Sequence, residues 1–140
     1  MQTYIGSKLV KAIPMTQQAF SAYTSGEHPA YESPDTEGFL LEDPKGSSNH
    51  PDHAGQISWM HGSHFRSEFK SIALPDSAPD YLQRLAGELV LLQQKLADLQ
   101  IFLKSDKFLK LQFTARDLLQ EQARIMSRYI TILEERLAFA

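Results

Sequence analysis

The sequence predicts an α+β protein made of a small N-terminal antiparallel β lobe with short helices, residues 1–76, and a long C-terminal antiparallel α-helical hairpin that oligomerises, residues 77–140. Two observations carry this prediction. All seven prolines lie at or before Pro79, and six of the seven glycines precede Gly87. The first half has short apolar runs between turn residues, whereas leucines recur every three or four residues in the second half.

Three short strands are expected in the N-terminal lobe. The first covers residues 8–13 and is closed by Pro14, and the others cover residues 38–41 and 56–60. The segment 42–55 between the last two is rich in Pro, Gly, Ser, Asn and Asp, which is typical of a long hairpin loop.

Two short helices complete the lobe. Thr16 is a plausible N-cap for a helix through Phe20 and Tyr23, and Ser63 for a helix that places Phe65 and Phe69 one turn apart. A lobe of fewer than about 80 residues buries little apolar surface, so we expect it to pack on the second half.

The first hairpin helix is expected at about 79–104. Ser77-Ala78-Pro79-Asp80 combines a capping hydroxyl, an early-helix proline and an acid three residues after the cap. Leucines then follow at the spacing of a coiled-coil seam, at Leu82, Leu85, Leu89, Leu92, Leu96, Leu99 and Leu103.

The second hairpin helix is expected at about 114–138, after a turn at residues 105–113. Thr114 and Asp117 repeat the capping signal. The apolar residues of this helix cover an arc of roughly 160°, wider than the stripe of about 100° that one partner helix would hide. We therefore expect a homo-oligomer.

Composition excludes several classes of protein. The net charge of −3 provides no broad cationic surface, so we expect neither DNA nor RNA as a partner. No apolar run reaches the roughly 20 residues of a membrane span, so we expect a soluble protein with no membrane partner. There is no cysteine and no secretory signal at the N-terminus, which favours the cytoplasm.

Arg136 is the first candidate for ligand binding because it shares the helical azimuth of Leu118 and projects from the apolar stripe. In the last helical turn it could reach water, bond terminal carbonyls or pair with a carboxylate. Alternatively it grips a ligand phosphate with two parallel hydrogen bonds. Gln122 in the same stripe could read a base edge or bond across a subunit interface.

A second candidate face lies on the first helix, where Arg84, Leu91, Lys95 and Phe102 fall on one line. Cations beside an aromatic ring suit a nucleotide, because the cation can bind the phosphate and the ring can stack on the base. The alternative, which the pattern favours, is a solvated face with two scattered apolar residues. Tyr81 could likewise be a packing residue at the helix start or a stacking platform.

No metal site, cofactor or catalytic site is expected. His50-x-x-His53 and His61-x-x-His64 could supply zinc ligands, but they lie in a flexible setting. The sequence has no Gly-rich phosphate loop, His-Glu-x-x-His helix or Gly-x-Ser-x-Gly elbow. We therefore expect a protein that is not an enzyme.

Specific motifs resemble a phage family. Residues 4–8 and 12–16, Glu37-Gly38-Phe39-Leu40, Asn49-His50-Pro51-Asp52-His53 and Ile57-Ser58-Trp59 resemble the N-terminal lobe of phage Thoeris anti-defence proteins of the first type. The second half resembles the helical hairpin that this family shares with the second anti-CBASS protein. The motifs that carry this second resemblance are Tyr81-Leu82-Gln83-Arg84, Lys95-Leu96 with Leu99, Phe102 and Leu103, and Gln122, Met126, Tyr129, Leu133, Arg136, Leu137 and Phe139.

The resemblance implies a sponge that catalyses nothing and sequesters cyclic nucleotide messengers in the cytoplasm of the infected bacterial host. It also implies a homohexamer that binds cyclic ADP-ribose isomers and cyclic di- or trinucleotides at separate sites. The ligand-binding residues that it implies are Arg136, Arg84, Tyr81, Gln83, Phe102, Lys95, Gln122 and Met126.

One departure from the family affects the expected ligand. Family members often have Lys-Leu-Thr where this chain has Asp98-Leu99-Gln100, and Asp98 would repel a phosphate there. The resemblance, with its complete N-terminal lobe, therefore favours cyclic ADP-ribose isomers over cyclic dinucleotides as ligands. The alternative function is a helical-hairpin interaction module that inhibits a host protein through its apolar stripe.

Overall fold

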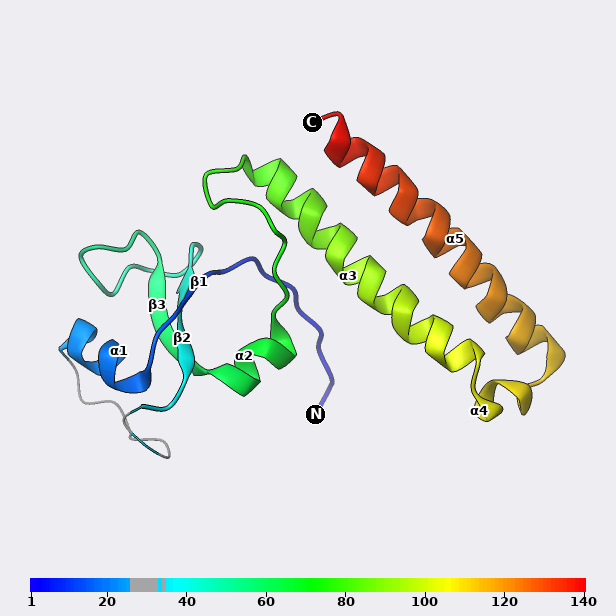
Figure 1. Ribbon diagram of the computed structural model, residues 1–140, viewed down its shortest axis with the longest axis horizontal. Coiled ribbons are helices and arrows are strands. Elements are labelled where there is room, and N and C mark those ends of the chain that lie inside the picture. Colours follow the sequence, from blue (N-terminus) through cyan, green and yellow to red (C-terminus); the bar gives the residue numbers. More distant parts are fainter. Residues whose placement is uncertain (26–32, 34) are drawn as a thin grey trace. The chain divides into compact units, whose positions relative to one another are not determined.

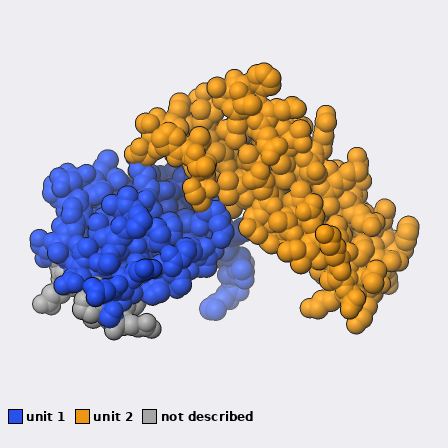
Figure 2. Space-filling view, viewed as in Figure 1, with its two compact units in different colours: residues 1–70 blue, residues 71–140 orange. Residues whose placement is uncertain are grey.

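The computed structural model describes residues 1–25, 33 and 35–140 (Figure 1). It confirms the predicted fold class. A three-stranded antiparallel sheet with short helices forms the N-terminal part, and two long helices pack together in the C-terminal part. The chain divides into two compact units, Met1–Lys70 and Ser71–Ala140 (Figure 2).

The sheet has the order β1-β2-β3, with β1 at Lys11–Pro14, β2 at Gly38–Asp43 and β3 at Gln56–His61. Its central strand, β2, is antiparallel to both neighbours. Leu40 therefore lies opposite Ile13 on one side and Trp59 on the other.

The predicted start of the first strand at Lys8 is wrong, because β1 begins at Lys11. Lys11 is paired with Glu42, and β2 ends one residue later, before Pro44. Proline has no amide hydrogen, so it cannot continue the ladder beside residues 8–10. The ammonium of Lys8 instead contacts the carboxylate of Asp43 at 3.3 Å.

The core of the first unit joins the sheet to α1 (Gln17–Thr24). Phe20 of this helix is buried with Leu40 and Ile57, and Trp59 and Met15 pack against them. The indole Nε1 of Trp59 donates a hydrogen bond to the main-chain oxygen of Met15 at 2.8 Å. The predicted N-cap of α1 is confirmed, since Thr16 Oγ1 accepts from the amide of Ala19.

The second short helix, α2 (Gly62–Glu68), begins differently from the prediction. His61, not Ser63, is its N-cap, and the ring Nδ1 of His61 accepts from the amide of Ser63 at 3.2 Å. Because β3 ends at His61, the backbone there is already extended, as an N-cap requires. Phe65 stacks on Phe69, as its spacing suggests, and on Phe39 of β2 with ring centroids 4.0 Å apart.

The second unit consists of α3 (Asp80–Leu103), α4 (Asp106–Leu109) and α5 (Phe113–Ala138). Its core cluster is Leu85, Leu89 and Leu133, and Leu82, Leu92, Ile130 and Leu137 pack against it. All seven leucines of the repeat in α3 are buried or half-buried, which confirms the predicted seam.

The expected helix caps in this unit are wrong. The N-caps are Pro79 and Gln112, not Ser77 and Thr114, and neither makes a side-chain capping bond to a described residue. The turn before α5 contains α4, which Ser105 caps through Oγ, and α5 begins at Phe113, after three further residues. Thr114 therefore lies within the first turn of α5 and not in front of it.

None of the helices in the described part of the chain combines the length and the apolar character needed to span a bilayer.

Candidate ligand-binding groove

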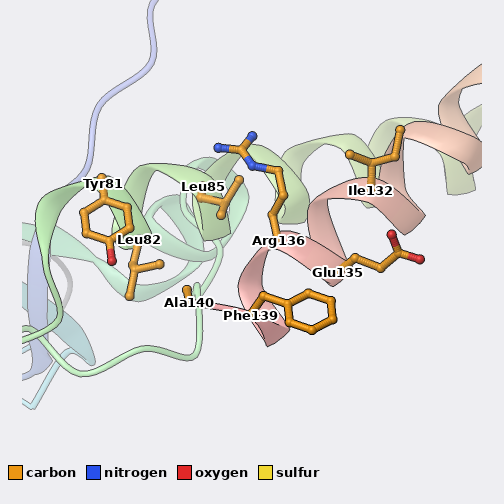
Figure 3. Close-up of a pocket in the computed structure, with 8 residues that line it drawn as sticks. All are labelled: Tyr81, Leu82, Leu85, Ile132, Glu135, Arg136, Phe139 and Ala140. Carbon is orange, nitrogen blue, oxygen red and sulfur yellow. The ribbon is translucent and has the colours of Figure 1, made fainter.

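A groove lies at the open end of the hairpin, where α3 begins and α5 ends, and encloses a volume of about 450 Å³ (Figure 3). Its apolar lining comes from Leu82 and Leu85 of α3, from Ile132 of α5, and from Phe139 and Ala140, which follow α5. Leu82 and Leu85 also belong to the hairpin packing, so the floor of the groove is continuous with the core.

Tyr81, Glu135 and Arg136 supply the polar and aromatic groups of the groove. Tyr81 is the second residue of α3 and Arg136 lies in the last turn of α5. The buried cluster of Leu85, Leu89 and Leu133 sets the antiparallel helices in register, so that these two ends meet. The structure thus brings together two of the predicted site residues, Tyr81 and Arg136.

The groove carries two opposite charges that do not neutralise each other. Figure 3 shows the guanidinium of Arg136 and the carboxylate of Glu135 pointing in different directions from α5. Adjacent residues on a helix do not face each other. Neither side chain has a hydrogen-bond or ion-pair partner within residues 1–25, 33 and 35–140, and both are exposed. Both charges are therefore available to a ligand.

A cross-helix hydrogen bond lies close to Arg136. The Tyr129 hydroxyl of α5 donates to the carboxylate of Glu88 on α3. That bond is the main cause of the raised pKa of Tyr129, followed by desolvation and the negative charge of Glu88, while the positive charge of Arg136 opposes them. The phenol therefore remains protonated and links the two helices next to the groove.

Gln83 and Arg84, two other predicted site residues, interact with their own surroundings. The amide Nε2 of Gln83 donates to the main-chain oxygens of Ala78 at 2.7 Å and Asp76 at 3.1 Å. Gln83 thereby holds the loop that leads into α3 and Tyr81. Arg84 contacts Asp80 at 3.5 Å in a solvent-exposed ion pair, which contributes little to stability.

The remaining predicted residues lie away from the groove. Lys95 is exposed in the middle of α3, and Phe102 near its end packs edge-on against Phe108 with centroids 6.3 Å apart. On α5, the amide of Gln122 contacts the sulfur of Met126 at 3.8 Å. The predicted set is therefore divided among at least three places on the hairpin.

Asp98, which departs from the family pattern, is also far from the groove. Its carboxylate accepts a hydrogen bond from Gln94 at 3.0 Å. At 1.5 Å per residue it lies about 26 Å along α3 from Tyr81. Within one protomer its charge does not act on a phosphate held by Arg136.

The sequence-based reasoning missed several residues of the groove, notably Leu85, Ile132, Glu135 and Phe139 as lining residues. One signal could have found two of them. Glu135 and Phe139, the C-cap residue of α5, are four positions apart in the sequence, a spacing that brings two side chains near each other at a helix end, next to Arg136.

The apolar α5 stripe, defined as Leu118, Ile125, Tyr129 and Ile132, is only partly covered. These side chains are respectively 64%, 55%, 40% and 41% exposed, whereas Leu133 of the same helix is fully buried. The contact with α3 therefore hides one part of the apolar arc of α5 and leaves the rest exposed. Through Ile132 the stripe is continuous with the groove.

The histidines in the first unit form a hydrogen-bonded cluster. His53 Nδ1 lies 2.9 Å from the carboxylate of Glu42, and its Nε2 lies 3.0 Å from the hydroxyl of Tyr23. Hydrogen bonds from His53 and then from the amide of Gly55 lower the pKa of Glu42. His50 stacks on Tyr23 with centroids 4.4 Å apart.

This cluster shows no metal-binding geometry. No group of three or more His, Asp or Glu side chains in the described ranges could hold a metal ion. The ring nitrogens of His53 are engaged by Glu42 and Tyr23, so the cluster fixes the loop between β2 and β3.

Residues 79–139 match the family described as Sequestin, a name that denotes sequestration. The match covers less than half of the chain and includes α3, α4 and α5, of which α3 and α5 line the groove. Searches of curated proteins and of solved structures gave no match.

Proposed function

We propose that this protein sequesters cyclic nucleotide immune messengers, namely cyclic ADP-ribose isomers and cyclic oligonucleotides, without cleaving them. One observation carries the proposal. The segment that is similar to the Sequestin family is also the segment that forms a groove with an unpaired guanidinium beside an exposed aromatic ring. The protein would act in the cytoplasm of an infected bacterial host.

The chemistry of the groove suits a small phosphorylated ligand. The guanidinium of Arg136 can hold a phosphate through two parallel hydrogen bonds. The ring of Tyr81 can stack a base, and the leucines between them offer an apolar floor. A ligand with one to three phosphates needs only a few such groups, so the net charge of −3 is no obstacle.

We further propose that copies of the chain associate through the apolar α5 stripe. Four apolar or aromatic side chains that are 40–64% exposed lie along one side of α5, as exposed apolar residues do at interfaces. The groove is open along one side, and a second copy on the adjoining stripe would close it. The hexamer implied by the family resemblance is one such closed assembly.

A thermal-shift screen tests the ligand class. Cyclic ADP-ribose isomers, cyclic dinucleotides and cyclic trinucleotides are added separately, with linear nucleotides of equal charge as controls. A ligand that binds only the folded protein raises its melting temperature with concentration. A rise with at least one cyclic ligand, and none with its linear control, supports the proposal; no shift with any of them contradicts it.

The exposed stripe also favours a second candidate, a module that inhibits a host protein by helix packing. Mass measurement in solution separates the two functions. An oligomer that binds cyclic nucleotides supports sequestration, whereas a monomer without nucleotide affinity favours the interaction module.

A further inference from the structure

Glu135 poses a problem for a groove that receives a phosphate. Its carboxylate lines the same groove as the guanidinium of Arg136 and would repel an anionic ligand nearby. It has no hydrogen-bond or ion-pair partner in the described part of the chain. A ligand that gains from Glu135 must therefore present hydrogen-bond donors to it, away from the phosphate.

A ligand could place its phosphate near Arg136 and its hydrogen-bond donors near Glu135, because the two side chains point in different directions from α5. Phe139, the C-cap residue of α5, follows Glu135 by four positions and Arg136 by three, so it lies near both, and it is 90% exposed. A base stacked on that ring would have its edge near the carboxylate of Glu135. Arg136 points in a different direction, as Figure 3 shows, so a phosphate there would lie apart from Glu135.

We infer that Glu135 makes the groove selective for guanine. This inference rests on the proposed function and names the ligand class of the same site. The Watson–Crick edge of guanine presents two adjacent donors, the N1 hydrogen and the 2-amino group, and one carboxylate accepts both. Adenine presents a single amino group there, and the lone pair of its N1 faces the carboxylate.

The inference fits the general behaviour of base recognition in proteins. Unpaired bases are stacked on aromatic side chains and read at their Watson–Crick edges. A site built to pair with a donor discriminates strongly against an analogue that lacks it, because its own polar group is then left unpaired. Glu135 is thus a specificity residue, Phe139 a stacking residue and Arg136 the phosphate ligand.

Calorimetry with two matched ligands tests the inference. Cyclic di-guanosine monophosphate and cyclic di-adenosine monophosphate have the same ring size and the same two phosphates, so they differ only in the bases. The variants are Glu135→Gln and, as a matched control, Glu134→Gln. Glu134 precedes Glu135 on α5, but its carboxylate accepts a hydrogen bond from Gln93 of α3 at 3.3 Å and does not line the groove.

The unmodified protein is expected to bind the guanine ligand at least tenfold more tightly than the adenine ligand. Glu135→Gln should remove most of that preference, and Glu134→Gln should preserve it. Both positions are exposed, so neither variant should impair folding.

Three results would overturn the inference. The first is that the unmodified protein binds the two ligands with equal affinity. The second is that Glu135→Gln raises the affinity for both ligands by the same factor, which would mean that Glu135 only repels phosphate. The third is binding of cyclic ADP-ribose isomers but of neither dinucleotide. In all three cases messenger binding remains and the proposed function stands. Failure to bind any cyclic nucleotide would overturn both.

Discussion

Replacing Ile125 by aspartate tests whether the apolar α5 stripe joins copies of the chain. Ile125 lies in the middle of the stripe and is 55% exposed in the single chain. It is not part of the cluster of Leu85, Leu89 and Leu133 that holds α3 and α5 together. The substitution should therefore weaken self-association while leaving the fold of the hairpin nearly unchanged.

The size of the effect follows from the exposed fraction. Full burial of an isoleucine side chain contributes about 1.5–3 kcal/mol, so covering the exposed half contributes about 1–1.5 kcal/mol. A symmetric contact includes the residue twice and loses about 2–3 kcal/mol, which weakens association by roughly 30- to 150-fold. The cost of burying two carboxylates adds to this loss.

Analytical ultracentrifugation over a range of protein concentrations measures the change. Ser127→Asp is the matched control, because Ser127 is also exposed and lies two positions along α5, on another side of the helix. The Ser127→Asp variant should have the same circular dichroism spectrum and the same association constant as the unmodified protein. If Ile125→Asp associates as strongly as the control, or if the unmodified chain is a monomer, the reasoning about the stripe is refuted.

Three further substitutions test the fold and the groove. Leu133→Ala should lower the free energy of unfolding of the hairpin by about 3–5 kcal/mol in urea titrations, because it opens a cavity at a fully buried position. Glu42→Gln should lower the stability of the N-terminal unit by about 1.5–3 kcal/mol at neutral pH, since charged hydrogen bonds to His53 and Gly55 are weakened. Folding lowers the pKa of Glu42, so the carboxylate stabilises the fold above its ordinary pKa. The difference in free energy of unfolding between the unmodified protein and Glu42→Gln should therefore vanish as the pH falls through the folded-state pKa. A difference that persists at lower pH would contradict this assignment. Arg136→Ala should weaken messenger binding in calorimetry by at least about 2 kcal/mol, or roughly thirtyfold, and unchanged affinity would exclude a phosphate contact.

Much of the fold could be predicted because local patterns decide it. The leucine repeat of α3 predicted the seam residue by residue, since 3.6-residue periodicity places those positions on one face. Element ends were less predictable. β1 begins opposite Glu42, one residue before its partner strand stops at Asp43, and the sequence around Lys8 contains no sign of that limit.

The groove could be predicted only in part. Tyr81 and Arg136 stood out because each places an unusual group at a helix end, but their meeting depends on the register between α3 and α5. That register is set by the packing of Leu85 and Leu89 of α3 with Leu133 of α5, which neither helix specifies alone. The second candidate face, with Arg84, Lys95 and Phe102, contributes no residue to this groove, and Lys95 and Phe102 lie several turns of α3 away from it.

Recovery of a messenger from the purified protein tests the central claim most directly. Protein in slight excess is mixed with a cyclic messenger that stabilises it, and the filtrate of an ultrafiltration membrane is analysed by mass spectrometry before and after heat denaturation. Sequestration predicts that free messenger disappears from the first filtrate and returns in full, with unchanged mass and retention time, in the second. Messenger that stays free in the first filtrate, or that returns chemically altered in the second, would contradict the account.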